Sequence, residues 1–168
     1  MKIRKARLGE EKDIANVVVS TWKVAYKDIL PDEFLKSLTT ERHEKILREH
    51  IEKQTETVLV LEDDDERIVG MISGGKDRSG LYDCEVVAIY IIPEHQKKGY
   101  GKELFKALIR EYKKNSYKTM IVWAFKENKD QKFYEKLGGT IKQQKVEALW
   151  GIEKTIVGYV WADINTIV

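Results

Sequence analysis

The centre of the chain carries its clearest structural signal, in the residues Glu85-Val86-Val87-Ala88-Ile89-Tyr90-Ile91-Ile92-Pro93-Glu94-His95-Gln96-Lys97-Lys98-Gly99-Tyr100-Gly101-Lys102. Residues 85–92 are almost all apolar, which is typical of a strand covered on both faces of a sheet. Pro93 ends this strand because proline has no N–H to donate to a neighbouring strand. Apolar residues then recur at helical spacing and predict an amphipathic helix, whose buried face comprises Leu104, Phe105, Leu108, Ile109 and Tyr112.

The loop between this strand and this helix has the features of an anion-binding site. The first N–H groups of a helix have no partner within it, and the helix dipole adds partial positive charge there. Gly99 and Gly101 carry no Cβ, so a ligand can approach the backbone closely and the turn can adopt positive φ angles. Lys97, Lys98 and Lys102 add positive charge at the same point. Together these residues predict a site for a diphosphate-sized ligand.

Two common diphosphate-binding loops do not match these residues. A nucleoside triphosphate loop needs a glycine where Gln96 stands, and Ser or Thr where Glu103 follows Lys102. A dinucleotide loop needs a third glycine at the position of Leu104. Two rival interpretations of the loop remain. In the first, the loop binds the diphosphate of another nucleotide in spite of these mismatches. In the second, the glycines only form a tight entry to the helix and bind no ligand.

The segment Gln96-Lys97-Lys98-Gly99-Tyr100-Gly101 fits the pattern Gln/Arg-x-x-Gly-x-Gly/Ala and resembles the GNAT superfamily of acetyl-CoA-dependent N-acetyltransferases. The resemblance implies that acetyl-CoA is the co-substrate and that no metal takes part. It also implies that backbone N–H groups near Ile91, at a bulge in the strand, stabilise the acetyl carbonyl as it becomes an oxyanion. The cofactor-binding residues implied in this way are Ile91, Gln96, Lys97, Lys98, Gly99, Tyr100, Gly101, Lys102, Asn128 and Tyr134.

Residues 123–139 resemble a second segment of the same superfamily, in which a strand is followed by Asn and by a helix that bears Phe-Tyr. Asn128 is predicted to cap that helix, with Gln131 completing a capping box. The resemblance adds a contact from Asn128 to the pantetheine arm of CoA. It also implies that Tyr134 points at the thioester sulfur and protonates the departing thiolate. Phe133 and Tyr134 are about 100° apart on a helix, so we expect that they do not face the same core.

An amine that attacks a thioester must first lose a proton, and Glu85 is the predicted general base. Many members of the superfamily carry a glutamate at this place, and a carboxylate beside an apolar strand can act as a base. The alternative is that Glu85 lies at a solvated strand start. Cys84 has no histidine partner in the sequence, so we expect direct transfer of the acetyl group without a covalent enzyme intermediate.

The rest of the chain completes a mixed α/β pattern. Strands are predicted over residues 3–7, 57–61, 67–73, 85–92, 119–124, 140–147 and 155–163. Helices are predicted over residues 10–26, after Pro31, over residues 41–53, after Gly101 and over residues 129–136. The sequence therefore predicts a single domain, residues 1–168, with a GNAT-like mixed central β-sheet of about six or seven strands, split at the cofactor site and flanked by about four helices.

Composition excludes several classes of function. The 30 basic and 28 acidic residues leave a net charge of +2, which is no basis for binding nucleic acid. No apolar run approaches a membrane span or follows the basic N-terminus, so we expect no membrane association, no secretory signal and a cytoplasmic protein. The single cysteine and the scattered histidines form no metal-ligand pattern, so no metal is expected.

The acceptor is the least determined part of this prediction. The resemblance implies a primary amine of a small molecule or peptide, without naming it. Trp22 and Tyr26 share one helical face, where they either line the acceptor pocket or pack in the core. Residues 158–161 are a possible edge strand for a homodimer. A non-catalytic acyl-CoA-binding sensor or interaction module of the same fold is the alternative function.

Overall fold

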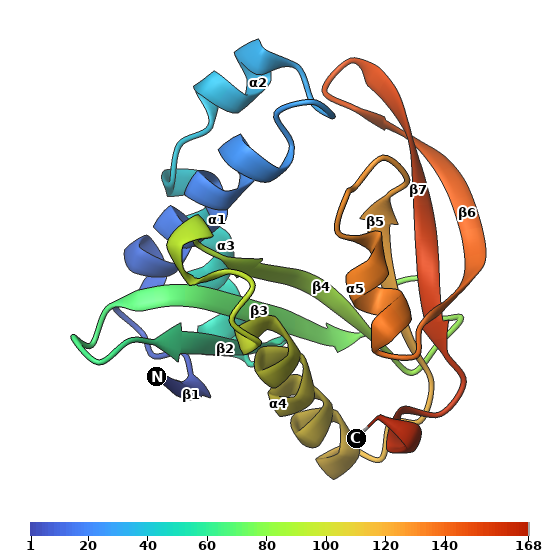
Figure 1. Cartoon of the computed structure of the whole chain (residues 1–168). Helices are drawn as coiled ribbons and strands as arrows, with labels where there is room; N and C mark the ends of the chain where they lie inside the picture. The colour runs from blue at the N-terminus through green and yellow to red at the C-terminus, as the bar shows by residue number, and fades with distance from the viewer. Residues whose placement is uncertain (168) are drawn as a thin grey trace.

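The computed structural model of the protein describes residues 1–167 and places seven strands in one mixed sheet (Figure 1). The strands lie side by side in the order β1-β2-β3-β4-β5-β7-β6. Their bounds are β1 Lys2–Lys5, β2 Thr57–Glu62, β3 Ile68–Lys76, β4 Cys84–Ile91, β5 Met120–Phe125, β6 Thr140–Leu149 and β7 Ile152–Trp161. Neighbouring strands are antiparallel except β4 and β5, which run parallel. The predicted mixed sheet is confirmed.

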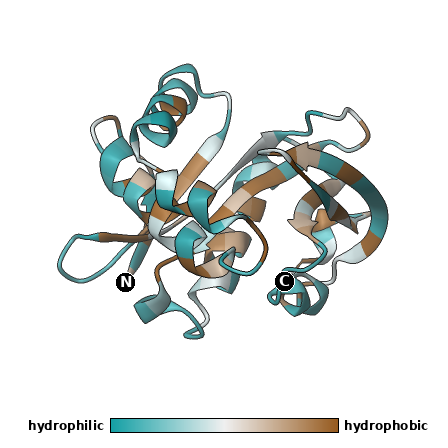
Figure 2. Cartoon of the chain, turned by 90° about the horizontal axis from the view of Figure 1, so that it is seen from above, coloured by the Kyte–Doolittle hydropathy of each residue, from teal (hydrophilic) through white to brown (hydrophobic). Residues whose placement is uncertain are grey.

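Helices cover both faces of the sheet, as the sequence predicted. Within the described residues there are five α-helices, where about four were expected: α1 Glu11–Ala25, α2 Asp32–Ser37, α3 Glu41–Lys53, α4 Tyr100–Lys114 and α5 Gln131–Lys136. Apolar residues of α1 and α3 pack against one face of β2 and β3, and the buried face of α4 packs against the other. Figure 2 shows hydrophobic residues gathered on the central strands, while the outer turns of the helices are hydrophilic.

The sheet opens at its centre. Strands β4 and β5 pair only through Cys84–Val86 and Met120–Val122, and beyond these residues they diverge (Figure 1). A bulge lies just past Val86, the last residue of β4 that pairs with β5. Ser73 of β3 opposes Ala88, while the next residue of β3, Gly74, opposes Val86. Val87 is therefore the extra residue, and such a bulge bends its strand. The outer half of β4 thus turns away from β5 and leaves a split in the sheet.

The β6–β7 hairpin is longer at its turn than predicted, because pairing between the two strands extends both of them. Both strands of the β6–β7 hairpin run several residues further towards its turn than the expected residues 140–147 and 155–163.

The proposed dimer edge at residues 158–161 is wrong, because β7 lies between β5 and β6. Residues 87–90 are only half-buried, although their apolar run predicted cover on both faces, because they border the split.

Two negative findings hold for the part of the chain that the structure describes. No helix in residues 1–167 combines the length and the apolar character needed to cross a membrane. In the same residues no cluster of three or more His, Cys, Asp or Glu side chains has the arrangement of a metal site.

Candidate active site in the split of the sheet

A cavity of about 520 Å³ occupies the split between β4 and β5. Its walls come from α1, the outer half of β4, the loop before α4, β5 and α5. The cavity brings together most of the predicted cofactor residues, namely Ile91, Gln96, Lys97, Gly99, Gly101, Lys102, Asn128 and Tyr134. Lys98 and Tyr100 belong to the same loop but do not line the cavity, and neither does Glu85.

The loop before α4 presents unpaired backbone amides. Gly99 has a φ of +89° as the N-cap of α4, a conformation that favours glycine. The first hydrogen bond of the helix runs from the Glu103 N–H to the Gly99 carbonyl at 3.3 Å. Among residues 1–167 the N–H groups of residues 97–102 have no acceptor. These amides, at the positive end of a 15-residue helix, give the loop the geometry that an anionic ligand needs.

Gln96 shapes this loop from within. Its side-chain Nε2 donates to the Ile91 carbonyl at 2.7 Å, which ties the loop to the last residue of β4. Gly101 permits a second close contact, because a Cβ there would lie 3.3 Å from a ring carbon of Phe133 on α5. Both contacts hold the helix start against the split. A glutamine side chain that bonds its own strand could not be predicted from the spacing of the motif.

The free edge of β4 offers further amides to the cavity. The Ile92 N–H donates to the Val69 carbonyl on β3 at 3.0 Å, and antiparallel pairing alternates the direction of successive N–H groups. The N–H groups of Ile89 and Ile91 therefore point away from β3, towards the side where β5 has diverged. The bulge lies at Val87 and not near Ile91, where the resemblance implied it, so only the free edge of β4 leaves the Ile91 N–H available as a candidate oxyanion donor.

Tyr134 lies buried at the wall of the cavity, with 8% of its surface exposed. Its ring packs between those of Phe133 and Tyr159, each at a centroid distance of 5.2 Å. Burial raises the pKa of the phenol, so the hydroxyl stays protonated near neutral pH. The expectation that Phe133 and Tyr134 do not share a core is wrong, because Tyr134 is buried in the same hydrophobic cluster on which Phe133 packs, where Phe133 lies 6.2 Å from Phe105 of α4 between ring centroids.

Asn128 does not cap α5 as predicted. The helix begins at Gln131 with Asp130 as its N-cap, and the Asn128 Oδ1 instead accepts the Asp130 N–H at 2.9 Å, before the helix begins. The Gln131 side chain bonds the Lys126 carbonyl and Tyr159, so no capping box forms. The Asn128 side chain remains on the cavity wall.

Glu85 is buried, with 3% of its surface exposed, so it does not lie at a solvated strand start. Its carboxylate accepts hydrogen bonds from the backbone N–H and the guanidinium of Arg78, in the segment between β3 and β4. It lies at the closed end of the split, where β4 still pairs with β5. Cys84 beside it is fully buried, and burial raises the pKa of its thiol to about 12, which disfavours the nucleophilic thiolate.

Aromatic residues gather at the other end of the cavity, where Tyr26 and Tyr90 line the wall and Trp22 and Trp150 do not. Trp22 on α1 makes edge contacts with Tyr26, with Tyr90 on β4 and with Trp150 at the tip of the β6–β7 hairpin. Trp150 also stacks on Phe34 of α2 at a centroid distance of 3.9 Å. The sequence indicated Trp22 and Tyr26 as candidates, but not Tyr90 and Trp150. No local pattern marks those two, because the chain brings them together from distant segments.

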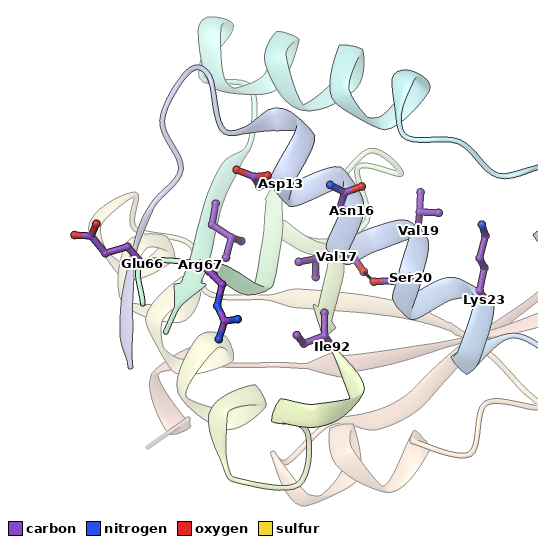
Figure 3. A pocket seen from close by; sticks show the side chains of 10 residues that line it. Asp13, Asn16, Val17, Val19, Ser20, Lys23, Glu66, Arg67 and Ile92 are labelled. Carbon is purple, nitrogen blue, oxygen red and sulfur yellow. Dashed lines mark hydrogen bonds between the residues drawn. The ribbon is translucent and has the colours of Figure 1, made fainter. Parts of the chain in front are cut away.

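A second hollow of about 600 Å³ lies between α1, the β2–β3 turn and Ile92 (Figure 3). Two of its polar side chains have partners, since Arg67 pairs with Asp63 at 2.8 Å and the Ser20 hydroxyl donates to the Val17 carbonyl at 3.2 Å. It holds none of the predicted site residues. The cavity in the split is therefore the candidate active site.

Known proteins share this architecture. Residues 22–139 match the family model described as the acetyltransferase (GNAT) family. A curated relative, the uncharacterized N-acetyltransferase YuaI of Bacillus subtilis (strain 168), is 28% identical over 167 residues, which are 98% of this chain and 95% of that protein.

Solved structures agree with this fold. The PaiA N-acetyltransferase of Thermoplasma acidophilum, in complex with coenzyme A, has a TM-score of 0.73 at 20% identity and covers 93% of this chain and 96% of its own. The acetyltransferase yncA of Salmonella typhimurium, with acetyl-CoA, has a TM-score of 0.73 at 21% identity and covers 96% and 93%. An N-acetyltransferase of Staphylococcus aureus Mu50 has a TM-score of 0.77 at 18% identity and covers 97% and 98%.

Proposed function

Because this chain belongs to the acetyltransferase (GNAT) family, we propose that it transfers the acetyl group of acetyl-CoA directly to a primary amine of a small molecule or peptide within a ternary complex. The protein is an acyltransferase, and acetyl-CoA is its co-substrate. The finer parts of the proposal are the acceptor, the ternary complex and the role of each residue.

One observation carries the proposal, namely the row of unpaired amides at residues 97–102 beside an open split in the sheet. Lys97, Lys98, Gly99 and Lys102 are exposed, so water can bond their N–H groups, and an anionic ligand can take the place of that water at the positive end of the helix. Lys97 and Lys102 line the same cavity and favour a diphosphate. From there the cavity continues along β4, where a pantetheine arm can pair with the free strand edge and Asn128 can contact it.

The chemistry proposed for the split follows from its polar groups. The amine nitrogen attacks the thioester carbonyl carbon, and the N–H groups near Ile91 stabilise the oxyanion that develops. The C–S bond then breaks, the thiolate receives a proton from the Tyr134 hydroxyl, and the phenolate regains a proton from the attacking nitrogen as that nitrogen becomes an amide. A thiol with a pKa near 8.5 is already a fair leaving group. The proton from the phenol therefore helps this step modestly, and its hydrogen bond to the sulfur supplies most of the effect.

Glu85 is proposed as the base that removes a proton from the ammonium form of the acceptor. Its carboxylate is held by Arg78 and does not line the cavity, so the proton would reach it through a water molecule.

Release of free thiol from acetyl-CoA in the presence of a panel of amines tests the proposal. Tyr134→Phe is expected to lower kcat by roughly tenfold or more, with the KM for acetyl-CoA changed little, since only the transition state loses its proton donor. Glu85→Gln is expected to lower kcat by roughly a hundredfold at neutral pH. Tyr82→Phe removes a hydroxyl that bonds Gln143 outside the cavity and serves as the matched control.

Thermal shift separates the rival functions. A ligand at a hundredfold its Kd stabilises a protein by about 2.7 kcal/mol. Stabilisation by CoA without thiol release for any amine would indicate a sensor or interaction module. Stabilisation by ATP or NAD in preference to CoA would indicate another nucleotide diphosphate, and either result overturns the proposal.

A further inference from the structure

The wall of the cavity carries a surplus of positive charge. Among the described residues a single carboxylate, that of Asp130, lines the cavity together with five lysines, namely Lys97, Lys102, Lys129, Lys132 and Lys136. The whole chain has a net charge of only +2, so this surplus is local and not a property of the general surface. Charge of one sign that lines a cleft raises the local concentration of a ligand with the opposite charge. The wall therefore favours an anionic ligand.

Two of the five lysines lie where the diphosphate is expected. Lys97 belongs to the loop before α4 and Lys102 to the first turn of that helix, beside the unpaired amides. The amides and these two ammonium groups are enough to match the charge of a diphosphate. The lysines that α5 contributes are therefore left for another anionic group.

Lys132 and Lys136 are exposed residues on one face of α5, because they lie four positions apart. In residues 1–167 neither forms an ion pair, whereas Lys129, which precedes the helix, pairs with Asp28 at 3.2 Å. Like charges four residues apart destabilise a helix. An anionic group bound between Lys132 and Lys136 would relieve that repulsion.

This face of α5 is turned away from Tyr134. Successive helical residues are rotated by about 100°, so Tyr134, two positions from each lysine, lies about 160° around the helix from both. Phe133 lies between the two directions, and a Cβ on Gly101 at the start of α4 would lie 3.3 Å from its ring. Tyr134 is buried, while Lys132 and Lys136 are exposed. The two lysines therefore lie at the outer mouth of the cavity, near the first turn of α4.

The chemistry of coenzyme A supplies an anionic group for this place. The 3′-phosphate of its ribose lies beyond the diphosphate, on the side away from the thioester. A phosphate monoester carries about −1.5 to −2 charge at pH 7, which two ammonium groups match. An anionic group of the acceptor fits less well, because the acceptor must bring its nitrogen to the thioester beside Tyr134. The acceptor end of the cavity, lined by Tyr26 and Tyr90, is therefore not the end at which the two lysines lie.

We propose that Lys132 and Lys136 form a subsite for the 3′-phosphate of coenzyme A, and that the protein thereby distinguishes coenzyme A from 3′-dephospho-CoA. This inference rests on the proposed function only in the place given to the diphosphate, and it is independent of the acceptor. Both lysines are remote from Tyr134, so they contribute to the affinity for the co-substrate and take no part in the transfer of the acetyl group.

Calorimetric titration with CoA and with 3′-dephospho-CoA tests the proposal, because the two ligands differ only in that phosphate. At low ionic strength we expect the protein to bind CoA roughly tenfold more tightly, since two exposed ion pairs are lost with 3′-dephospho-CoA. Added salt screens such exposed pairs, so the ratio of the two Kd values should fall towards one as the salt concentration rises.

Substitutions assign the preference to residues. Lys132→Gln and Lys136→Gln should each raise the Kd for CoA roughly threefold, and the double variant should bind both ligands equally. Unchanged binding of 3′-dephospho-CoA would show that these variants are folded. Lys102→Gln should weaken both ligands by the same factor, because it removes a charge beside the diphosphate that they share. Lys142→Gln, an exposed position on β6 outside the cavity, is the matched control.

The outcomes separate this inference from the proposed function. Absence of binding by both ligands, together with absence of thiol release for every amine, contradicts the proposed function itself. Equal affinity of the parent protein for the two ligands overturns the inference and leaves the acetyltransferase intact. The same holds if the double variant still prefers CoA. A double variant that changes only the KM of the amine would assign the two lysines to an acidic acceptor and would also overturn the inference.

Discussion

The two ends of the cavity are built in different ways. At the cofactor end, a run of consecutive residues, 96–102, supplies backbone amides whose directions are set by one glycine turn and one helix start. Beyond it, the wall is made of side chains from α1, β4, β5 and α5. The first end depends on local conformation, and the second depends on tertiary packing.

This difference explains which parts of the function a sequence can disclose. Backbone amides are common to all residues, so a site made of them leaves a signature only in the glycines that permit its conformation. A site made of side chains from four segments leaves no compact signature. A short motif therefore indicates the binding site of the acetyl donor, while the binding site of the acceptor depends on the whole fold. The following predictions test whether the two ends are independent.

The largest expected effect is at the cofactor end. Gly99→Val forces a β-branched residue to a φ of +89°, so the turn must rearrange and its amides lose their common direction. We expect the Kd for CoA to rise by at least roughly thirtyfold, as measured by calorimetry, because several hydrogen bonds to the diphosphate are lost together.

Gly80 provides the control for this variant. It has a φ of +74° in the segment between β3 and β4, with open space around it, so Gly80→Val carries a similar backbone strain of about 1–2 kcal/mol away from the cavity. Equal losses of CoA affinity in both variants would show that the effect is general destabilisation and would contradict the role of the loop.

A smaller effect is expected at the acceptor end. Trp150→Ala removes the stacking on Phe34 and the edge contact with Trp22, each of which contributes about 0.5–1.5 kcal/mol. The KM for the amine should rise roughly threefold to fivefold, while the Kd for CoA stays within twofold, as measured by steady-state kinetics and calorimetry. Val146→Ala, on the exposed side of β6, is the control. A matching loss of CoA affinity would show that the two ends are coupled.

The smallest effect concerns pH. Burial raises the pKa of Tyr26, Tyr90 and Tyr134, so in the folded state these phenols keep their protons above pH 10 while the unfolded chain loses them. The free energy of unfolding should therefore be unaffected by them below pH 10 and should fall above it. At pH 10.5 we expect a loss of less than about 1 kcal/mol for each tyrosine, measured by denaturant titration. Tyr134→Phe should weaken this dependence, and a variant as alkali-sensitive as the parent protein would contradict the assignment.

The sequence predicted the elements of the fold well where a local pattern was strong. The apolar stripe of α4 and the limits of α3 follow from helical spacing, and both were found as expected. The predicted start of α5 was wrong because the Asn128 side chain accepts the N–H of Asp130 in a turn before the helix. Asparagine favours such turns as well as helix caps, so the residue type alone does not distinguish them. The edge role of residues 158–161 was wrong because chain order does not give strand order.

The candidate site shows the same division. Gly99 and the residues around it were predicted from a motif, and the structure brings most of them to one cavity. Tyr90 and Asp130 carry no motif, and they become candidates only when the fold brings them to the wall of one cavity. For Glu85 the sequence left two environments open, and the bond to Arg78 follows from a segment whose path the sequence does not specify.

The short ladder between β4 and β5 has a mechanical consequence. Cys84–Val86 and Met120–Val122 are the residues that join the block β1–β4 to the block β5–β7–β6 within the sheet. If the two blocks rotated by a few degrees about this short ladder, the split between β4 and β5 would widen or narrow, while the hydrogen bonds of the ladder would change little in length. A molecule that touches both blocks fixes that angle, and it slows hydrogen exchange at hinge amides that it never contacts.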